Sequence, residues 1–256
     1  MTWIEDFFDE IYRDFMEHYR GPEASYKEAQ FLIRKLGIEP GKLFLDAACG
    51  HGRHLRYMPE GTVVGLDINL KYLKEAKKYA DVVAADLRLP PFRRRAFSGI
   101  YIMHSSIGMF GDEEDVEILM WLSGTIKPGG VMALDLANKV KIDRAYAALG
   151  DSWNFWISAG PYRILSTATY NPLVGRIKER RIIYRSGEYL GTKTLELRLY
   201  SPSEVNLMLR SIGMTIREVY GDFDGSPFSE VSDRYIVIAV KTGGVPEALK
   251  AAASWA

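Results

Sequence analysis

Residues 43–54 read LFLDAACGHGRH, an apolar run that ends in Asp46 and leads into small residues and glycines. Small residues let the backbone pass close to a ligand, and the amide groups at the start of a following helix are free to bind one. The sequence therefore predicts a strand over 43–47, a tight turn, and a helix that begins within 52–58. Taken alone, the pattern is also compatible with an ordinary turn that binds nothing.

Two further acidic residues follow apolar runs in the same way. Asp67 ends the run VVGLD, about 20 residues beyond the turn, and Asp86 follows DVVAA. In adenosine-binding sheets an acid at this distance accepts hydrogen bonds from the ribose hydroxyls. Each aspartate alone is also explained as a helix or turn cap, but three on successive strands predict a binding crevice at the carboxyl edge of a parallel sheet.

Apolar runs alternate with helical patterns on both sides of this region. Two helices are expected before residue 37, separated by Gly21-Pro22, because apolar residues recur there at helical spacing. Beyond the turn, strands are expected at 62–66, 81–85, 99–104 and 131–136, with helices at 70–79 and 112–126 and a turn at 127–130. This alternation predicts an α/β fold, a parallel sheet with helices on both faces.

The alternation stops after the fifth strand. Residues 153–199 contain four strand-like runs joined at Gly-Pro, Asn-Pro and Ser-Gly pairs. A helix then begins after Ser201, whose spacing to Glu204 matches a capping box, and strands at 215–220 and 235–240 close the fold. We therefore predict a core formed by residues 1–150 and 200–242, an inserted antiparallel β cap at 151–199, and a C-terminal tail at 243–256 that forms a surface helix.

The composition is that of an ordinary globular protein. The 256 residues are 47% hydrophobic and 26% charged, and 33 basic residues balance 33 acidic ones, which argues against disorder and disfavours a dedicated nucleic-acid-binding protein. One cysteine allows neither an intrachain disulfide nor a cysteine-based zinc site, and the N-terminus lacks a signal-peptide pattern, so we expect a cytoplasmic protein. No apolar stretch reaches about 18 residues, so no membrane partner is expected. One glutamine and five asparagines suggest a thermophilic source.

These motifs together resemble class I S-adenosylmethionine-dependent methyltransferases. The resemblance is carried by LDAACGHGR (45–53), GLDI (65–68), ADLRLPPF (85–92), IYIMHSSIGMF (100–110) and IKPGGVMALDL (126–136). A dinucleotide dehydrogenase is disfavoured because ACGHGR does not space its glycines as GxGxxG. The family implies a three-layer, Rossmann-like, mostly parallel seven-stranded sheet, S-adenosylmethionine as cofactor and S-adenosylhomocysteine as its product.

The resemblance also implies a role for each residue of the turn. Asp46 would orient the methionine amino group, directly or through the turn. Ala48, Gly50 and Gly52 would bring the backbone against the methionine and ribose parts. Ala48 stands where the family usually has glycine, a departure that a small side chain should tolerate.

The next two strand ends would hold the rest of the nucleoside. Asp67 would bind the ribose hydroxyls, with Ile68 against the adenine. Asp86 would accept a hydrogen bond from the adenine amino group, with Leu87 beside the ring.

His104, at the end of the fourth strand, would face the methionine or the methyl acceptor. It is the candidate catalytic base, and the alternative is a packed histidine whose ring satisfies a nearby carbonyl. His51 is interpreted as a loop residue and Cys49 as a small buried side chain. Arg53 either neutralises an acidic ligand group or caps a neighbouring loop. We predict no metal site.

The methyl acceptor is narrowed by what is missing. HSSIGMF stands where enzymes that methylate exocyclic amines of bases or of glutamine have Asn/Asp-Pro-Pro-Tyr/Phe. Methylation of cytosine at carbon 5 needs a cysteine nucleophile, and the single cysteine, Cys49, belongs to the cofactor turn. The inserted cap resembles that of small-molecule N- and O-methyltransferases, and its exposed edges offer a surface for a homodimer. We therefore predict a small-molecule acceptor. The alternatives are an RNA acceptor bound by the basic residues of 176–185 and the three arginines at 93–95, and a non-catalytic S-adenosylmethionine-binding protein.

Overall fold

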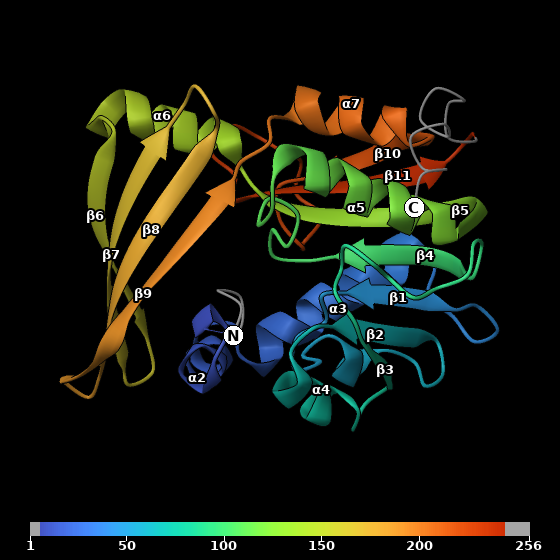
Figure 1. The fold of residues 1–256 in the computed structure, drawn as a ribbon, viewed down its shortest axis with the longest axis horizontal. Helices are drawn as coiled ribbons and strands as arrows, with labels where there is room; N and C mark the ends of the chain where they lie inside the picture. Colours follow the sequence, from blue (N-terminus) through green and yellow to red (C-terminus); the bar gives the residue numbers. More distant parts are fainter. Residues whose placement is uncertain (1–5, 244–256) are drawn as a thin grey trace.

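The structure, a computed structural model, describes residues 6–243 and contains two separate β-sheets (Figure 1). The larger sheet has seven strands in the order β10-β11-β5-β4-β1-β2-β3. Strands β1 to β5 pair in parallel, whereas β11 pairs antiparallel with both β5 and β10. This arrangement confirms the predicted α/β fold class. The strands are β1 (Phe44–Ala47), β2 (Val63–Asp67), β3 (Asp81–Ala84), β4 (Phe97–Ile102), β5 (Ile126–Ala137), β10 (Met214–Tyr220) and β11 (Arg234–Lys241).

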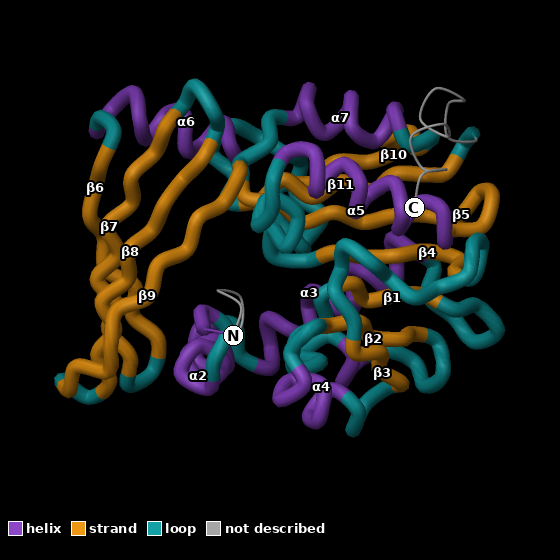
Figure 2. The backbone as a smooth tube through the Cα atoms, viewed as in Figure 1, coloured by secondary structure: helices purple, strands orange, loops and turns teal. Residues whose placement is uncertain are grey.

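Helices cover both faces of the seven-stranded sheet and complete three layers (Figure 2). On one face, α5 (Asp112–Thr125) and α7 (Pro202–Ser211) bury their apolar sides in a single core cluster with β1, β4 and β5. On the other face, α3 (Pro22–Leu36) and α4 (Leu70–Ala76) pack in a second cluster. The sheet strands are buried on both sides, which explains their continuous apolar runs.

The four-stranded antiparallel sheet stands beside this core, at the left of Figure 1. It consists of β6 (Ser152–Ala159), β7 (Tyr162–Asn171), β8 (Arg176–Arg185) and β9 (Glu188–Arg198), paired in chain order. Helix α6 (Lys139–Leu149) leads into it, and α2 (Glu10–Tyr19) lies between it and the core. Phe15 of α2 packs with Tyr162, Ile164 and Ile183 of the sheet, so the N-terminal helix joins the two parts.

Three local predictions differ from the structure. The helix expected within 52–58 is only one 3-10 turn, η1 (Leu55–Tyr57), because Pro59 favours an extended Met58. The turn expected at 127–130 lies within β5, whose ladder with β4 shifts register between Phe97 and Gly99. Helix α6 was not predicted, although Asn138 caps it by accepting from two backbone amides. The predicted tail helix lies almost entirely outside the described residues.

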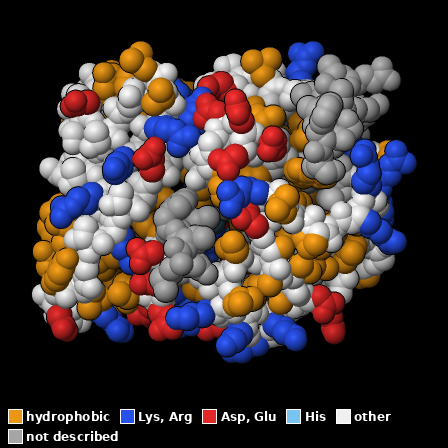
Figure 3. Space-filling view, in the orientation of Figure 1, with side chains coloured by type: hydrophobic (Ala, Val, Ile, Leu, Met, Phe, Trp, Pro, Cys, Tyr) orange, Lys and Arg blue, Asp and Glu red, His pale blue; other side chains and the backbone are white. Residues whose placement is uncertain are grey.

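The surface agrees with the balanced charge of the chain. On the face drawn in Figure 3, acidic and basic side chains are interspersed among apolar ones. Within residues 6–243, no helix combines the length and the hydropathy needed to cross a bilayer.

Candidate functional site

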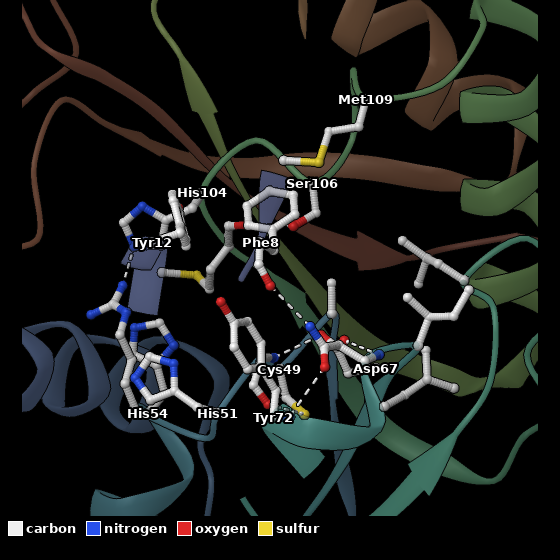
Figure 4. A pocket seen from close by; sticks show the side chains of 18 of the residues that line it. Phe8, Tyr12, Cys49, His51, His54, Asp67, Tyr72, His104, Ser106 and Met109 are labelled. Carbon is white, nitrogen blue, oxygen red and sulfur yellow. Dashed lines mark hydrogen bonds between the residues drawn. The ribbon is translucent and has the colours of Figure 1, made fainter. Parts of the chain in front are cut away.

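A cavity of about 1110 Å³, its open mouth included, lies at the carboxyl ends of the central strands (Figure 4). Its walls come from the turn after β1, the end of β2, the loop after β3, the end of β4 and helix α2. Of the residues predicted for the site, Ala48, Gly50, Asp67, Ile68, Asp86, Leu87 and His104 line this cavity, whereas Asp46 and Gly52 do not.

The turn after β1 is tied to the end of β2 through Asp67. Its two carboxylate oxygens accept from the backbone N–H groups of Gly50 and Asn69, each at 2.8 Å. A carboxylate has about four lone-pair positions, so two remain available for a ligand in the cavity. Burial raises the pKa of Asp67, while these backbone hydrogen bonds oppose the rise.

Left-handed backbone shapes the turn. Ala48, Gly50 and Gly52 have φ angles of 66°, 56° and 83°. Glycine adopts these angles freely, whereas Ala48 pays a steric cost that we set at about 1–2 kcal/mol. Gly52 serves packing rather than the cavity wall, because a Cβ there would lie 2.8 Å from the Cα of Ala76.

Packing beneath the turn also depends on Gly65 of β2. A Cβ at this position would lie 2.7 Å from the sulfur of Cys49, which is buried as predicted. Gly65 stands within the apolar run VVGLD, and nothing in that pattern marked it as a packing position.

Asp46 lies beneath the turn and is almost completely buried. Its Oδ2 atom has no hydrogen-bond partner among residues 6–243, and neither has the hydroxyl group of Tyr101. Burial raises the pKa of Asp46 to about 8. A positively charged or donating group placed at the turn would therefore stabilise the ionised carboxyl group of Asp46.

Asp86 reaches the cavity wall but is engaged by its own loop. Arg88 donates to the Asp86 carboxylate from its backbone N–H at 2.9 Å and from its guanidinium at 2.7 Å. These hydrogen bonds lower the pKa of Asp86. A ligand amino group would share this carboxylate with Arg88.

Helix α2 and the residues just before it close one side of the cavity. Phe8, Tyr12 and Met16 line it, although the sequence pattern marked none of them as a residue of the site. The segment is held from both sides: the Lys193 ammonium of β9 donates to the carbonyls of residues 6 and 7, and Tyr72 of α4 donates to the carbonyl of Asp9 at 2.8 Å. The α2 wall thus depends on contacts with both the cap sheet and the core.

His104 follows β4 in a strained backbone conformation. His104 and Ser105 have φ angles of 54° and 57°, which non-glycine residues seldom adopt. Asp135 of β5 stabilises this bend: its Oδ2 atom accepts from the His104 backbone N–H at 2.9 Å, and its carbonyl accepts from that of Ser105 at 2.8 Å. The strain turns the His104 ring to the cavity, where it is about a quarter exposed.

A buried polar cluster surrounds the His104 ring. Glu28 of α3 accepts from His54 at 2.8 Å, and the guanidinium of Arg53 contacts both Glu28 and the Nε2 atom of His104. Burial opposes ionisation of Glu28, but the hydrogen bond from His54 and the positive charge of Arg53 lower its pKa. Burial lowers the pKa of His104 to about 4. The guanidinium supplies the positive charge between these groups that a metal ion would otherwise bring, so we assign no metal here.

His51 also lines the cavity, from the turn itself. Burial and nearby arginines lower its pKa to about 4. Its ring meets that of Tyr72 edge to face, with centroids 5.8 Å apart.

Comparisons with known proteins agree on one family. Residues 44–130 match a family model described as a methyltransferase domain. An uncharacterized methyltransferase of Synechocystis is 31% identical over 138 residues, which are 50% of this chain and 57% of that protein. The chain spans between 32% and 57% of the length of three curated relatives.

Solved structures share the fold over most of the chain. The CcbJ methyltransferase from Streptomyces caelestis superimposes with a TM-score of 0.74 at 15% identity, covering 85% of this chain and 94% of that one. CalS10 from Micromonospora echinaspora, an amino pentose methyltransferase solved with S-adenosylmethionine, gives 0.64 at 19% identity, covering 91% and 98%. These likenesses extend over the inserted β-sheet as well as the core.

Proposed function

We propose that this chain, which belongs to the class I S-adenosylmethionine-dependent methyltransferases, moves a methyl group to a nitrogen or oxygen atom of a small molecule. The observation that carries the proposal is the cavity at the carboxyl ends of β1, β2 and β4, closed on one side by α2. Because that wall is made of Phe8, Tyr12 and Met16, the space beside the turn suits a compact acceptor.

The residues of the cavity suit S-adenosylmethionine. Asp67 keeps two lone-pair positions for the ribose hydroxyls, and Ile68 and Leu87 offer apolar surfaces for the adenine. The unpartnered oxygen of Asp46 suits the amino group of the methionine part, reached directly or through the turn. Asp86 is the weakest of the expected contacts because Arg88 already binds it.

S-adenosylmethionine, when bound, supplies a methyl group already activated by the sulfonium charge. The chain's task is then to align the acceptor and exclude water. Phe8, Met16 and Met109 supply apolar surface that keeps water from the space beside His104. His104, facing this space, is the side chain best placed to touch the acceptor.

A nitrogen acceptor is supported by the likeness to KedS8 from Streptoalloteichus, described as a sugar N-methyltransferase, which superimposes with a TM-score of 0.62 at 17% identity. One curated relative is instead named a sterol 24-C-methyltransferase, from Yarrowia lipolytica, at 23% identity over 47% of this chain. The competing acceptor is therefore the carbon of a lipid. A low-mass polar product would support our proposal, and a sterol product would replace it.

The RNA alternative loses support because much of the basic strand is already paired. Arg181 binds Glu179, Arg185 binds Asp14, and Arg176 donates to the carbonyl of Phe110. These arginines contact the chain itself and are less available to phosphates.

The cellular setting, the source and a homodimer are proposed from the composition of the chain and from the exposed edges of the cap sheet. The single, buried cysteine supports a cytoplasmic setting, and the scarcity of amide side chains supports a thermophilic source. Strands β6 and β9 are the edges of the cap sheet, and Trp156 on β6 is 60% exposed, which supports a homodimer through this sheet. Light scattering at several concentrations tests that part.

Transfer of label tests the reaction. The purified chain is incubated with methyl-labelled S-adenosylmethionine and an extract of its source cells, separated beforehand into low-mass, lipid, RNA and protein fractions. We expect label in the low-mass polar fraction. Label in RNA would establish the alternative acceptor, and binding of S-adenosylhomocysteine without any transfer would establish a non-catalytic protein.

A further inference from the structure

The buried cluster beside the cavity joins side chains that lie far apart in the sequence: Glu28 from α3, Arg53 and His54 from the segment after β1, and His104 from the end of β4. We propose that Glu28 and Arg53 fix the two imidazoles as neutral rings of opposite tautomer, so that His104 offers the methyl acceptor a hydrogen-bond donor and not a base. The role toward the acceptor rests on the proposed function, whereas the tautomers do not.

The proton of His54 is assigned by its partner. The Nε2 atom of His54 lies 2.8 Å from a carboxylate oxygen of Glu28. The low pKa of Glu28 means that this oxygen can only accept. His54 therefore carries its proton on Nε2.

The proton of His104 is assigned in the opposite way. Its Nε2 atom contacts the Nη2 atom of Arg53. Every guanidinium nitrogen is a donor, so the contact with Arg53 requires Nε2 of His104 to accept. The Glu28 oxygen that lies 3.4 Å from the same Nε2 atom already accepts from Arg53 and His54. We therefore place the ring proton on Nδ1. The two rings are stacked with 8° between their planes and centroids 6.2 Å apart, yet carry their protons on different nitrogens.

Charges from every element around His104 agree with a neutral ring. Within the described part of the chain, Glu28 of α3 is the carboxylate that approaches the ring, and Arg53 neutralises it. Asp135 of β5 is occupied by the His104 backbone N–H and by Arg234 of β11. Burial and Arg53 lower the His104 pKa to about 4, against the opposing effect of Glu28, so the ring is uncharged at neutral pH.

The Nδ1 proton of His104 is then available to a ligand. Among residues 6–243, no hydrogen-bond partner engages Nδ1, and the ring lines the cavity, as Figure 4 shows. A hydrogen bond donated to the attacking atom of the acceptor would weaken its nucleophilicity. The Nδ1 proton of His104 is therefore expected to bind an oxygen substituent next to the atom that is methylated. We infer an acceptor that carries a hydroxyl, ether or carbonyl oxygen at that position.

Nuclear magnetic resonance of the imidazole nitrogens tests the tautomers without any acceptor. The chain has four histidines, so His18→Gln and His51→Gln variants assign the spectrum. We expect His104 protonated on Nδ1 and His54 on Nε2 between pH 6 and 8, with neither ring titrating. A charged His104, or a His104 protonated on Nε2, would overturn the proposal.

Arg53→Met is the decisive variant. Without the guanidinium, Glu28 accepts from His104, so the proton of His104 moves to Nε2 and its pKa rises. Arg56→Met is the matched control, because Arg56 bonds to Tyr79 away from the cluster. An unchanged His104 tautomer in Arg53→Met would count against the assignment, and the wild-type spectrum alone decides the question if this variant does not fold. Binding of zinc to both imidazoles at stoichiometric concentration would replace the assignment by a metal site.

Two near-isosteric variants test the role of His104 toward the acceptor. His104→Asn keeps a donor near the Nδ1 position, whereas His104→Asp offers only acceptors, and both residues tolerate a positive φ. With serial dilutions of the low-mass extract as acceptor, we expect Asn to stay within about threefold of the wild-type apparent KM and Asp to raise it about tenfold or more. Activity retained by Asp and lost by Asn would establish a base instead. Absence of transfer by the wild type, with the expected tautomers observed, would refute the proposed function alone.

Discussion

Replacing Asp67 by asparagine should weaken binding of S-adenosylhomocysteine, the stable product of the proposed reaction. The two oxygens of Asp67 accept from the backbone amides of Gly50 and Asn69 and keep lone pairs for the ribose. Asparagine has a single acceptor oxygen, so its amide group must face either a backbone N–H or a ribose hydroxyl. The substitution preserves the size of the side chain, which limits its effect on packing.

The expected loss follows from one hydrogen bond to a charged, half-buried acceptor. Such bonds contribute about 1.5–3 kcal/mol, which corresponds to a Kd raised about 10- to 150-fold at 25 °C. Isothermal titration calorimetry at pH 7 measures this directly. Thermal unfolding without ligand shows whether the variant is folded under the same conditions.

Asp86→Asn is the matched control, because Arg88 already engages that carboxylate and the group is partly exposed. We expect its Kd to rise by less than about threefold. This change corresponds to less free energy than one neutral hydrogen bond contributes, about 1 kcal/mol. An Asp67→Asn variant that binds as tightly as the wild type, or an Asp86→Asn variant that binds more weakly than Asp67→Asn, would refute the reasoning.

Three further predictions follow from other parts of the site. Asp46→Asn should raise the free energy of unfolding of the ligand-free chain at pH 8. Since the folded pKa is raised from 3.8 to about 8, the wild type loses up to about 5–6 kcal/mol of stability as pH rises from 4 to 8, and the gain measured in urea should grow over that window and then level off. Gly52→Ala should lower the unfolding free energy by about 2–4 kcal/mol through strain and overlap, whereas Gly61→Ala, with a positive φ and open space, should lower it by about 1–2 kcal/mol; equal losses would disprove the overlap. Lys193→Met should speed hydrogen exchange of residues 10–19 about tenfold, whereas the exposed Lys178→Met should leave it unchanged; protection unaltered in both variants would rule out Lys193 as the clamp on α2.

The fold was predictable because its signals are local. Apolar strands, of four to eight residues except for the longer β5, are separated by helical patterns, a capping box at Ser201 and glycines at turns, and this alternation is typical of a helix-covered sheet. The residues of the turn and of the next strand end were predicted from the same spacing, and the cavity brings most of them together. The structure differs from the predicted elements where a single residue ends or starts an element. Pro59, for example, limits the predicted helix to one 3-10 turn.

The cluster around His104 could not be predicted in the same way. Glu28 is 76 residues from His104, and only the packing of α3 beneath the strand ends brings them together. One signal was present: Glu28 lies on the same helical face as Ser25, Ala29 and Leu32, all of which are buried. An acidic residue on a buried helix face needs a partner, and the partners were visible only in three dimensions.

A structure of the chain with S-adenosylhomocysteine is the most direct test of the central claim, that this cavity holds the donor and presents its methyl group beside His104. The account predicts ribose hydroxyls on Asp67, the adenine between Ile68 and Leu87, and the sulfur facing the space bordered by His104 and Met109. A ligand bound elsewhere, or one whose sulfur faces away from that space, would contradict it.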